Sequence, residues 1–224
     1  MITSRSSDWP FEIPGVRHLD AWSYLTQSEE TDQDRSHRVI NLCRAQNYQS
    51  VGYYVSLLAE ARGHRPTPSV MTLQDLRNRS FKQLLSDDLD KLIQKSLRSL
   101  HSEEFSLSVY FGRNLARRYD RLARHLFNLL PIPLARYDFV RRDSHWSIRR
   151  VVPLAVRDTP EAHQEFLQQA ATVYFLGRSS AVRSPKRSRF DMAILHNPEE
   201  GLNSPSDPAA IKRLQRVARD VGVY

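Results

Sequence analysis

The chain has 224 residues, of which 40% are hydrophobic and 26% charged, and it carries a formal net charge of +8 at pH 7. That length suits one large domain, or one domain and part of another, and the apolar fraction is sufficient for a packed core. No apolar run reaches the roughly 18 residues that a membrane-spanning helix needs, and the N-terminus lacks the apolar stretch of a secretory signal. The single cysteine, Cys43, excludes an intramolecular disulfide. These features predict a cytoplasmic protein without a membrane partner.

The excess positive charge is concentrated near the C-terminus. Residues 177–189, GRSSAVRSPKRSR, contain five basic residues and no acidic one, and so supply five of the eight excess charges. Elsewhere basic and acidic residues are interleaved, as in SDDLDKLIQKSLRSLHSEE at 86–104. A short basic tract is typical of a solvated linker, and we predict a linker over 177–189. Nucleic-acid binding through this tract is the less favoured alternative.

The first third of the chain predicts an irregular start, a buried strand and a helix. Two prolines and a glycine mark turns in DWPFEIPGV at 8–16. The β-branched run HRVINLC at 37–43 predicts a short buried strand. A helix is expected from about Gln49 to Arg62, ending at Gly63, which suits a left-handed C-terminal residue. Its predicted apolar face consists of Val51, Tyr54, Val55 and Leu58.

The middle of the chain predicts more helices and the clearest strand. Helical periodicity extends from Thr72, a potential N-cap with Asp75, to Leu100, with a break expected near 84–89. Strict alternation in EFSLSVYFG at 104–112 predicts a strand. The segment NLARRYDRLARHLFNLLP at 114–131 predicts an amphipathic helix that begins directly after Gly112.

The remaining pattern predicts a hairpin, a helix and a further β-α unit. Residues 134–156 read as two antiparallel strands around the turn RRDSH, followed by a helix over 160–176. A strand at 190–198 and a helix from Asp207 to Val221 then open a unit whose next strand is not completed. We therefore predict an α/β protein, with α+β as the alternative: an N-terminal module with a mixed sheet and flanking helices, then an incomplete Rossmann-like β-α unit.

Cys43 lies where a predicted strand gives way to a helix, a position at which thiols can be activated. A catalytic cysteine also needs a base, and the scattered histidines of the sequence do not provide an identifiable one. Free cysteine usually behaves as a small buried hydrophobe, and this is the interpretation that we favour. No residue of the chain is predicted to be catalytic or to bind a metal.

The polar turn after the cysteine, CRAQNYQS at 43–50, is the first candidate binding site. Backbone N–H groups at a helix N-terminus can bind an anion or a carboxylate, and a guanidinium would assist them. The alternative is plain helix capping by Asn47 or Ser50. The candidate substrate-binding residues of this turn are Arg44, Asn47, Gln49 and Ser50.

The segment YFGRNLARRYDR at 110–121 repeats the pattern of strand, turn and helix. Arg113 and Arg117 are four residues apart, so on a helix they would share one face, where guanidinium groups grip carboxylates or phosphates well. With Asn114 they form the second candidate substrate-binding group. Salt bridges to Asp120 or to other acidic residues are the alternative. The two turns would converge only if their strands were adjacent and parallel.

Two long stretches, NLCRAQNYQSVGYYVSLLAEARGHRPTPSV and FSLSVYFGRNLARRYDRLARHLFNLLP, resemble the N-terminal domain that precedes RimK-like ATP-grasp ligases. The opening DWPFEIPGV fits the same family. The tail RFDMAILHNPEEGLNSPSDPAAIKRLQRVARDVGV resembles the first β-α unit of the pre-ATP-grasp domain of these enzymes. The resemblance implies a RimK-like domain over 1–176, the basic linker over 177–189 and a truncated pre-ATP-grasp domain over 190–224.

The resemblance also implies a function for the parent protein. RimK-like ligases form an acyl phosphate from ATP and a carboxylate, with Mg²⁺, and an amine then attacks it; glutamate addition is the usual association. The ATP-grasp domain is expected after Tyr224, so it would be a missing partner, and ATP and Mg²⁺ would bind outside this chain. We expect this chain to be non-catalytic and to recognise a substrate or partner. The alternative is a standalone module that binds an acidic peptide or metabolite through its arginines.

Overall fold

A computed structural model describes residues 1–26, 37–45, 47, 49–177, 212–214 and 216–217. The chain divides into two compact units, Met1–Val182 and Arg183–Tyr224. The strand predicted at 190–198 and nearly all of the predicted linker lie outside the described residues. In the second unit, residues 212–214 and 216–217 are helical, within the helix predicted from Asp207 to Val221.

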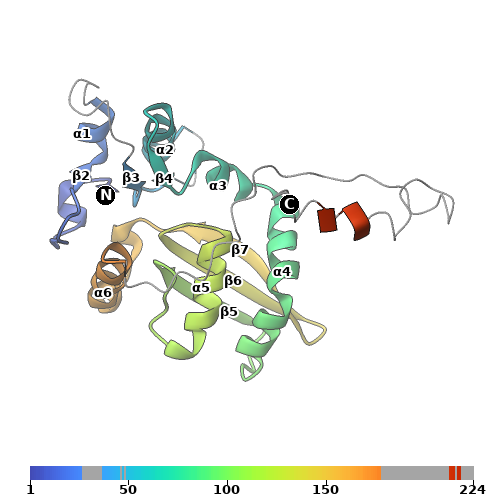
Figure 1. Cartoon of the computed structure of the whole chain (residues 1–224). Coiled ribbons are helices and arrows are strands. Elements are labelled where there is room, and N and C mark those ends of the chain that lie inside the picture. The colour runs from blue at the N-terminus through green and yellow to red at the C-terminus, as the bar shows by residue number, and fades with distance from the viewer. Residues whose placement is uncertain (27–36, 46, 48, 178–211, 215, 218–224) are drawn as a thin grey trace. The chain divides into compact units, whose positions relative to one another are not determined.

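The first unit consists of an N-terminal part with short strands and a C-terminal part with longer ones (Figure 1). The N-terminal part contains β1 (Ile2–Thr3), η1 (Ser6–Asp8), β2 (Leu19–Asp20), α1 (Ala21–Thr26), β3 (Arg38–Ile40), α2 (Val51–Ala61), β4 (Arg65–Thr67) and α3 (Val70–Asp75). The C-terminal part contains α4 (Arg79–Leu97), β5 (Glu104–Tyr110), η3 (Arg117–Tyr119), α5 (Asp120–Leu129), β6 (Leu134–Arg142), β7 (His145–Pro153), η4 (Val156–Asp158), η5 (Glu161–His163) and α6 (Gln164–Phe175). The predicted α/β class is confirmed.

Parallel pairing occurs in the N-terminal part and antiparallel pairing in the C-terminal part. β1 pairs with β2 and β3 pairs with β4, both in parallel. An isolated parallel bridge between Ile2 and Asn41 joins β1 to the residue after β3, and the Leu42 N–H donates to the Ile2 carbonyl at 2.8 Å. Around these strands a buried cluster forms from Ile2, Ala21, Tyr24, Val39, Cys43, Val55 and Ala59.

Helix α2 buries a different face from the one predicted. Its buried residues are Gly52, Val55, Ser56 and Ala59, whereas Val51 and Tyr54 are exposed. The prediction was right for Val55 and wrong for Val51 and Tyr54, because it weighed hydrophobicity alone. The small residues let the helix approach the preceding turn closely, and the hydroxyl of Ser56 donates to the Pro68 carbonyl at 2.7 Å. The N-cap of α3 is Ser69 rather than Thr72, and α4 runs unbroken through 84–89.

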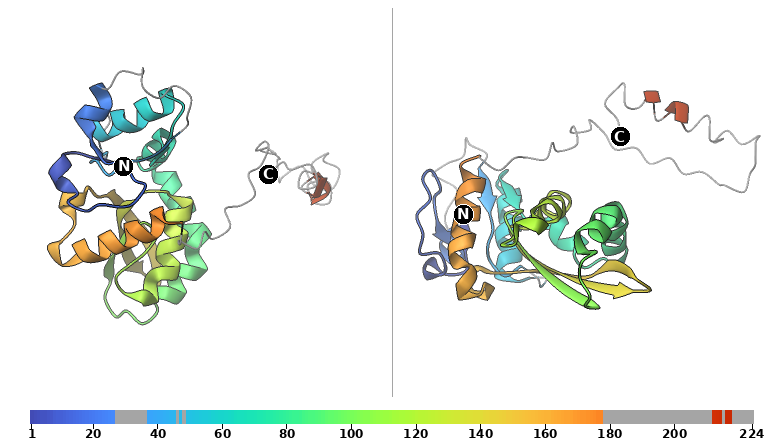
Figure 2. Two further views of the ribbon diagram at one scale, coloured as in Figure 1. Left: turned by 60° about the vertical axis from the view of Figure 1, so that its left-hand side comes forward. Right: turned by 90° about the horizontal axis from the view of Figure 1, so that it is seen from below.

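The C-terminal part is a three-stranded antiparallel sheet in the order β5-β6-β7. Helices α4 and α5 cover one of its faces (Figure 2), and the main core lies between them and the sheet. The strand predicted at 104–112 and the predicted hairpin are both confirmed. The hairpin turns at Asp143 and Ser144, whose φ values of 48° and 64° are those of a tight turn that matches the twist of the strands. A register shift follows Asp138 in β6.

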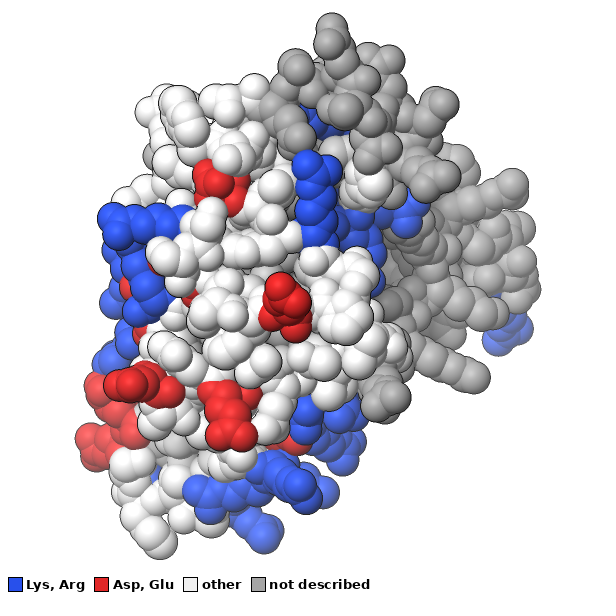
Figure 3. Space-filling model, turned by 90° about the vertical axis from the view of Figure 1, so that its left-hand side faces the viewer, with Lys and Arg blue, Asp and Glu red and all other residues white. Residues whose placement is uncertain are grey.

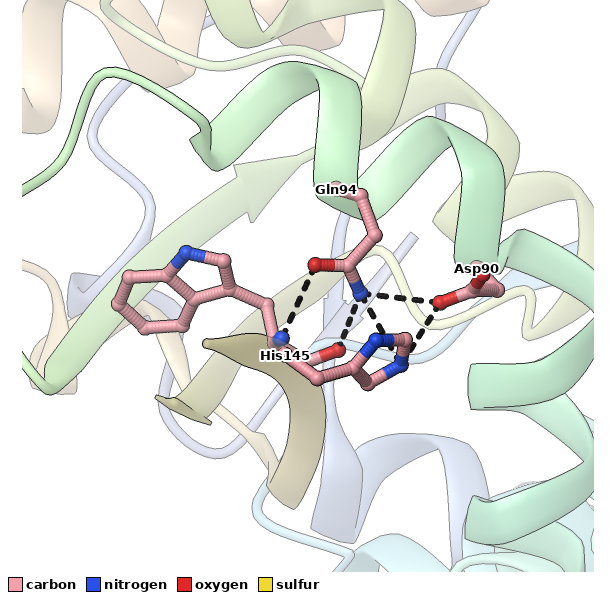
Figure 4. A network of polar contacts seen from close by, with 4 residues as sticks. Asp90, Gln94 and His145 are labelled. Atoms are coloured by element: carbon pink, nitrogen blue, oxygen red, sulfur yellow. Dashed lines mark hydrogen bonds and ion pairs between the residues drawn. The ribbon is translucent and has the colours of Figure 1, made fainter. Parts of the chain in front are cut away.

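A side-chain amide fixes α4 to the exposed edge of this sheet (Figure 4). Gln94 accepts a hydrogen bond from the Trp146 N–H at 3.0 Å and donates one to the Trp146 carbonyl at 2.7 Å. It therefore makes the pair of contacts that a neighbouring strand would make with β7. Asp90 accepts from the same amide at 2.9 Å and lies 3.0 Å from the ring of His145. Since unpaired edges invite unwanted pairing, this contact protects the edge at Trp146.

Candidate functional site

The first predicted turn is a helix cap with one ion pair. The Ser50 hydroxyl accepts from the Tyr53 N–H at 3.3 Å, so Ser50 is the N-cap of α2, as the capping alternative proposed. Arg44 forms an ion pair with Asp158, which already provides a carboxylate for its guanidinium. Asn47 and Gln49 are exposed, and Gln49 has a φ of 63°. Ligand binding by these four residues stays a prediction that the geometry does not strengthen.

Close packing of α2 against this turn explains its shape. A Cβ atom on Gly52 would lie 2.6 Å from the carbonyl oxygen of Arg44, so only glycine fits there. The buried amide of Asn41 connects strand, turn and helix: it donates to the Gly52 carbonyl at 2.7 Å and to the Ser56 hydroxyl at 2.9 Å, and it accepts from the Cys43 N–H at 3.0 Å. Asn41 was not among the predicted residues. Its signal was an amide within an otherwise apolar strand.

Cys43 is 4% exposed and lies in the apolar cluster around β1 and β3. Burial raises the pKa of its thiol to about 12, so the nucleophilic thiolate is scarce at neutral pH. This environment supports the interpretation of Cys43 as a core residue.

The second predicted turn does not lead directly into a helix. Phe111 and Gly112 both have positive φ, at 49° and 77°, and reverse the chain. The backbones of Tyr110 and Arg113 then pair with each other through two hydrogen bonds of 2.8 and 2.9 Å. Since α5 begins only at Asp120, the premise that Arg113 and Arg117 share one helical face is wrong.

Asn114 has a structural role at the edge of β5. It is 8% exposed; its amide donates to the Ser108 carbonyl at 2.7 Å and its oxygen accepts from the Ala116 N–H at 2.9 Å. Its own N–H donates to the Asp120 carboxylate at 2.9 Å. These bonds show that Asn114 stabilises the turn, and its predicted part in ligand binding stays a prediction. Leu115, which lies within the segment predicted to be an amphipathic helix, is exposed at 42%.

The two turns belong to strands that are not neighbours. β3 pairs only with β4 among the strands of the described chain, and β5 pairs with β6. The condition under which the two predicted groups would converge is therefore not met.

Arg113 instead takes part in a cluster with α6. Its guanidinium carbon lies 5.7 Å from the ring centroid of Phe166, and the ring of Phe166 is 6.2 Å from that of Tyr110. The hydroxyl of Tyr110 lies 2.8 Å from Nδ1 of His163, the residue that immediately precedes α6. Tyr110, Arg113, His163 and Phe166 thus form one contiguous group, which we call the Tyr110–His163 cluster. Of these four residues only Arg113 was predicted as a site residue; Tyr110 was not, and His163 and Phe166 are distant from it in the chain.

The arginines in this part of the chain differ in whether they have a carboxylate partner. Within the described chain, no carboxylate lies within ion-pair distance of Arg113. Arg136, on the neighbouring strand β6, has its partner: Asp138 accepts from it at 3.1 Å and from the Ser106 hydroxyl at 2.7 Å. Arg117 is exposed on η3. Among the three predicted arginines, Arg113 is therefore the one whose guanidinium packs against an aromatic ring and has no carboxylate partner among the described residues.

A hollow lies in the N-terminal segment. It has a volume of about 760 Å³ and is lined by residues from Met1 to His18, including Trp9 and Phe11. The indole N–H of Trp9 is shielded from solvent and so is not presented to the hollow. The lining of the hollow also includes the polar residues Glu12 and His18.

The surface charge does not form a basic face on the side that Figure 3 displays. Acidic and basic residues lie there in separate small groups over the described chain. Among the described residues no group of three or more His, Cys, Asp or Glu side chains could hold a metal ion. No described helix has the length and apolarity to cross a membrane.

Comparison with known families decides the classification. Residues 21–170, more than half of the chain, match the family described as RimK-like ATPgrasp N-terminal domain. The chain belongs to this family. No curated protein and no solved structure matches it.

The RimK-like ATPgrasp N-terminal domain, as matched, begins with α1 and ends within α6. It contains the sheet, both turns and the whole Tyr110–His163 cluster, whereas the hollow formed by residues 1–18 precedes it. The description of the family assigns such a domain to the N-terminal part of RimK-like ATP-grasp proteins.

Proposed function

We propose that this chain is a recognition module of an ATP-dependent carboxylate–amine ligase. The match of residues 21–170 to the RimK-like ATPgrasp N-terminal domain carries the proposal. The described residues support a binding role, since they contain a positioned arginine and a histidine–tyrosine pair, while the single cysteine is buried. In the ligase, ATP and Mg²⁺ would supply the activation of a carboxylate. Among the described residues, no group of three or more His, Cys, Asp or Glu side chains would hold the Mg²⁺ ion.

The activity of the isolated chain tests the first half of this proposal. With ATP, Mg²⁺ and glutamate, we expect the purified 224-residue chain to form no ADP above a heat-denatured sample. ADP formation that requires the folded chain and Mg²⁺ would contradict a non-catalytic role. A mock preparation from cells without the gene controls for contaminating ATPases.

The proposed recognition role can be tested in a longer protein, if the reading frame continues into an ATP-grasp domain. Removal of residues 1–176 from that longer protein is expected to raise KM for the carboxylate or amine substrate more than it lowers kcat. This split follows because a module that only binds substrate contributes equally to the ground state and to the transition state. An unchanged KM would refute a role in substrate recognition.

A further inference from the structure

We propose that Arg113 and Nε2 of His163 form a binding site for a single carboxylate, with Tyr110 as the residue that orients the imidazole. The inference rests on the proposed recognition function and names the chemical class of ligand. It replaces the predicted arrangement of Arg113, Asn114 and Arg117 on one helix, which the structure does not contain.

The orientation of His163 is set from the sheet. Its Nδ1 lies 2.8 Å from the hydroxyl of Tyr110, so the opposite ring nitrogen, Nε2, faces away from the sheet residue. Within the described chain Nε2 has no hydrogen-bond partner. His163 is only half-buried, so this nitrogen can be reached by a ligand.

We assign the phenol of Tyr110 as the donor to Nδ1 of His163, and this assignment makes Nε2 a donor. Burial raises the pKa of Tyr110, against the opposing effect of the Ser108 hydroxyl, so the phenol keeps its proton at neutral pH. When that phenol donates to Nδ1, a neutral imidazole must carry its hydrogen on Nε2. A protonated imidazole carries hydrogens on both nitrogens. Nε2 therefore offers an N–H group in both charge states.

Arg113 adds the positive charge. Two backbone hydrogen bonds to Tyr110 fix the base of its side chain, and Phe166 supports its guanidinium from α6. A guanidinium held in this way loses little freedom on binding, and its paired N–H groups match the two oxygens of a carboxylate. Because Tyr110 contacts both His163 and Phe166, the two donors share one scaffold.

The balance of charge favours a carboxylate over a phosphate. The site offers one permanent positive charge, whereas Glu161 in η5 and Glu165 in the first turn of α6 lie on the same stretch of chain as His163. These acidic residues oppose a dianion more strongly than a monoanion. The expected ligand is thus a carboxylate group, as on a glutamyl side chain.

Binding can be measured with N-acetylglutamate α-amide, which has one carboxylate, and with the matched glutamine compound, which has none. In ¹H–¹⁵N NMR titrations of the 224-residue chain, the glutamate probe should produce saturable shifts at Arg113, His163 and Phe166, and the glutamine probe should not. Arg113→Gln should weaken binding by about tenfold or more, since hydrogen bonds to charged groups are the strong ones. Arg117→Gln, a matched change at an exposed arginine, should change affinity less than about twofold.

A second variant separates orientation from packing. Tyr110→Phe keeps the ring and removes the hydroxyl, so long-range ¹⁵N spectra should show the neutral His163 losing its preference for hydrogen on Nε2, together with weaker binding. Equal binding of both probes, no shifts, or an unchanged affinity in Arg113→Gln would overturn the proposal. A lone pair on Nε2 in the unmodified chain would also overturn it. None of these outcomes affects the KM measurement on the longer ligase, so the carboxylate site and the proposed recognition function can fail independently.

Discussion

Cys43 illustrates how the surroundings of a side chain decide its chemistry. Because burial raises the pKa of the thiol to about 12, the protonated form dominates at pH 8. We predict that an aromatic disulfide reagent at pH 8 labels the native chain only slowly and labels it rapidly in denaturant. Labelling is slow because a raised thiol pKa lowers the fraction of thiolate, which is the reacting form.

The chain has one cysteine, so the absorbance of the released thiol reports this residue alone. Fast stoichiometric labelling under native conditions would show that Cys43 is accessible and would reopen the nucleophile hypothesis. Free glutathione at the same pH calibrates the intrinsic rate.

Asn114 is expected to matter for stability. Asn114→Ala removes the hydrogen-bond partners of the Ser108 carbonyl and of the Ala116 N–H; Asn114 itself is buried, Ser108 is partly buried and Ala116 is exposed. A typical hydrogen bond contributes about 0.5–1.5 kcal/mol, so we expect the free energy of unfolding to fall by roughly 1–3 kcal/mol, measured by urea denaturation. Arg117→Ala, three residues on and exposed, should change it by less than about 0.5 kcal/mol. Equal effects of the two changes would contradict the structural role of Asn114.

At the scale of elements, the turn between β5 and α5 shows where prediction from sequence reached its limit. Alternation correctly predicted the strand at 104–112, because a half-buried strand must alternate. The predicted helix began several residues before α5 does, because residues 114–119 have helical composition. The backbone reverses at Phe111 with a positive φ, which a bulky residue rarely adopts and which sequence does not announce. The proposed helical pair of arginines failed for this reason.

Gly52 gives a test in which two physical effects oppose each other. Alanine is favoured over glycine by about 1 kcal/mol in a helix interior and by less in the first turn, where Gly52 lies, so Gly52→Ala would at most slightly stabilise an isolated α2. In the protein the added Cβ would meet the Arg44 carbonyl oxygen at 2.6 Å. Overpacking costs about 1–3 kcal/mol, and backbone yields less than a side chain, so we expect net destabilisation.

The measurement is again urea denaturation, with Leu57→Ala as the control. Leu57 lies on the same helix and is 41% exposed, so its truncation should cost little. A Gly52→Ala variant that is more stable than the unmodified chain would mean that α2 and the turn do not pack as described.

At the scale of the whole molecule, the candidate site depends on contacts that no local pattern predicts. Tyr110 and His163 are 53 residues apart in the chain and meet because α6 packs back against the end of β5. Arg113 was predicted from the sequence as a binding residue, and the resemblance to the family predicted a role in a RimK-like ligase. The grouping of Arg113 with Phe166, and of Tyr110 with His163 and Phe166, required the tertiary structure.

The three hydrophobic clusters of the described chain draw all their members from residues 1–175. The first unit therefore contains the apolar burial that stabilises it, because burial is the main favourable term in folding. We predict that a chain shortened to residues 1–182 unfolds within about 0.5 kcal/mol of the 224-residue chain in urea, the scatter expected of changes outside a core.

The same shortened chain should bind the glutamate probe with unchanged affinity, because Arg113, Tyr110 and His163 lie in the first unit. A large loss of stability would show that the second unit contributes to the core of the first. A loss of binding with stability retained would show instead that residues 183–224 supply part of the site. Comparing unfolding and titration on one preparation separates these outcomes, because the first reports the cores and the second reports the cluster at the start of α6.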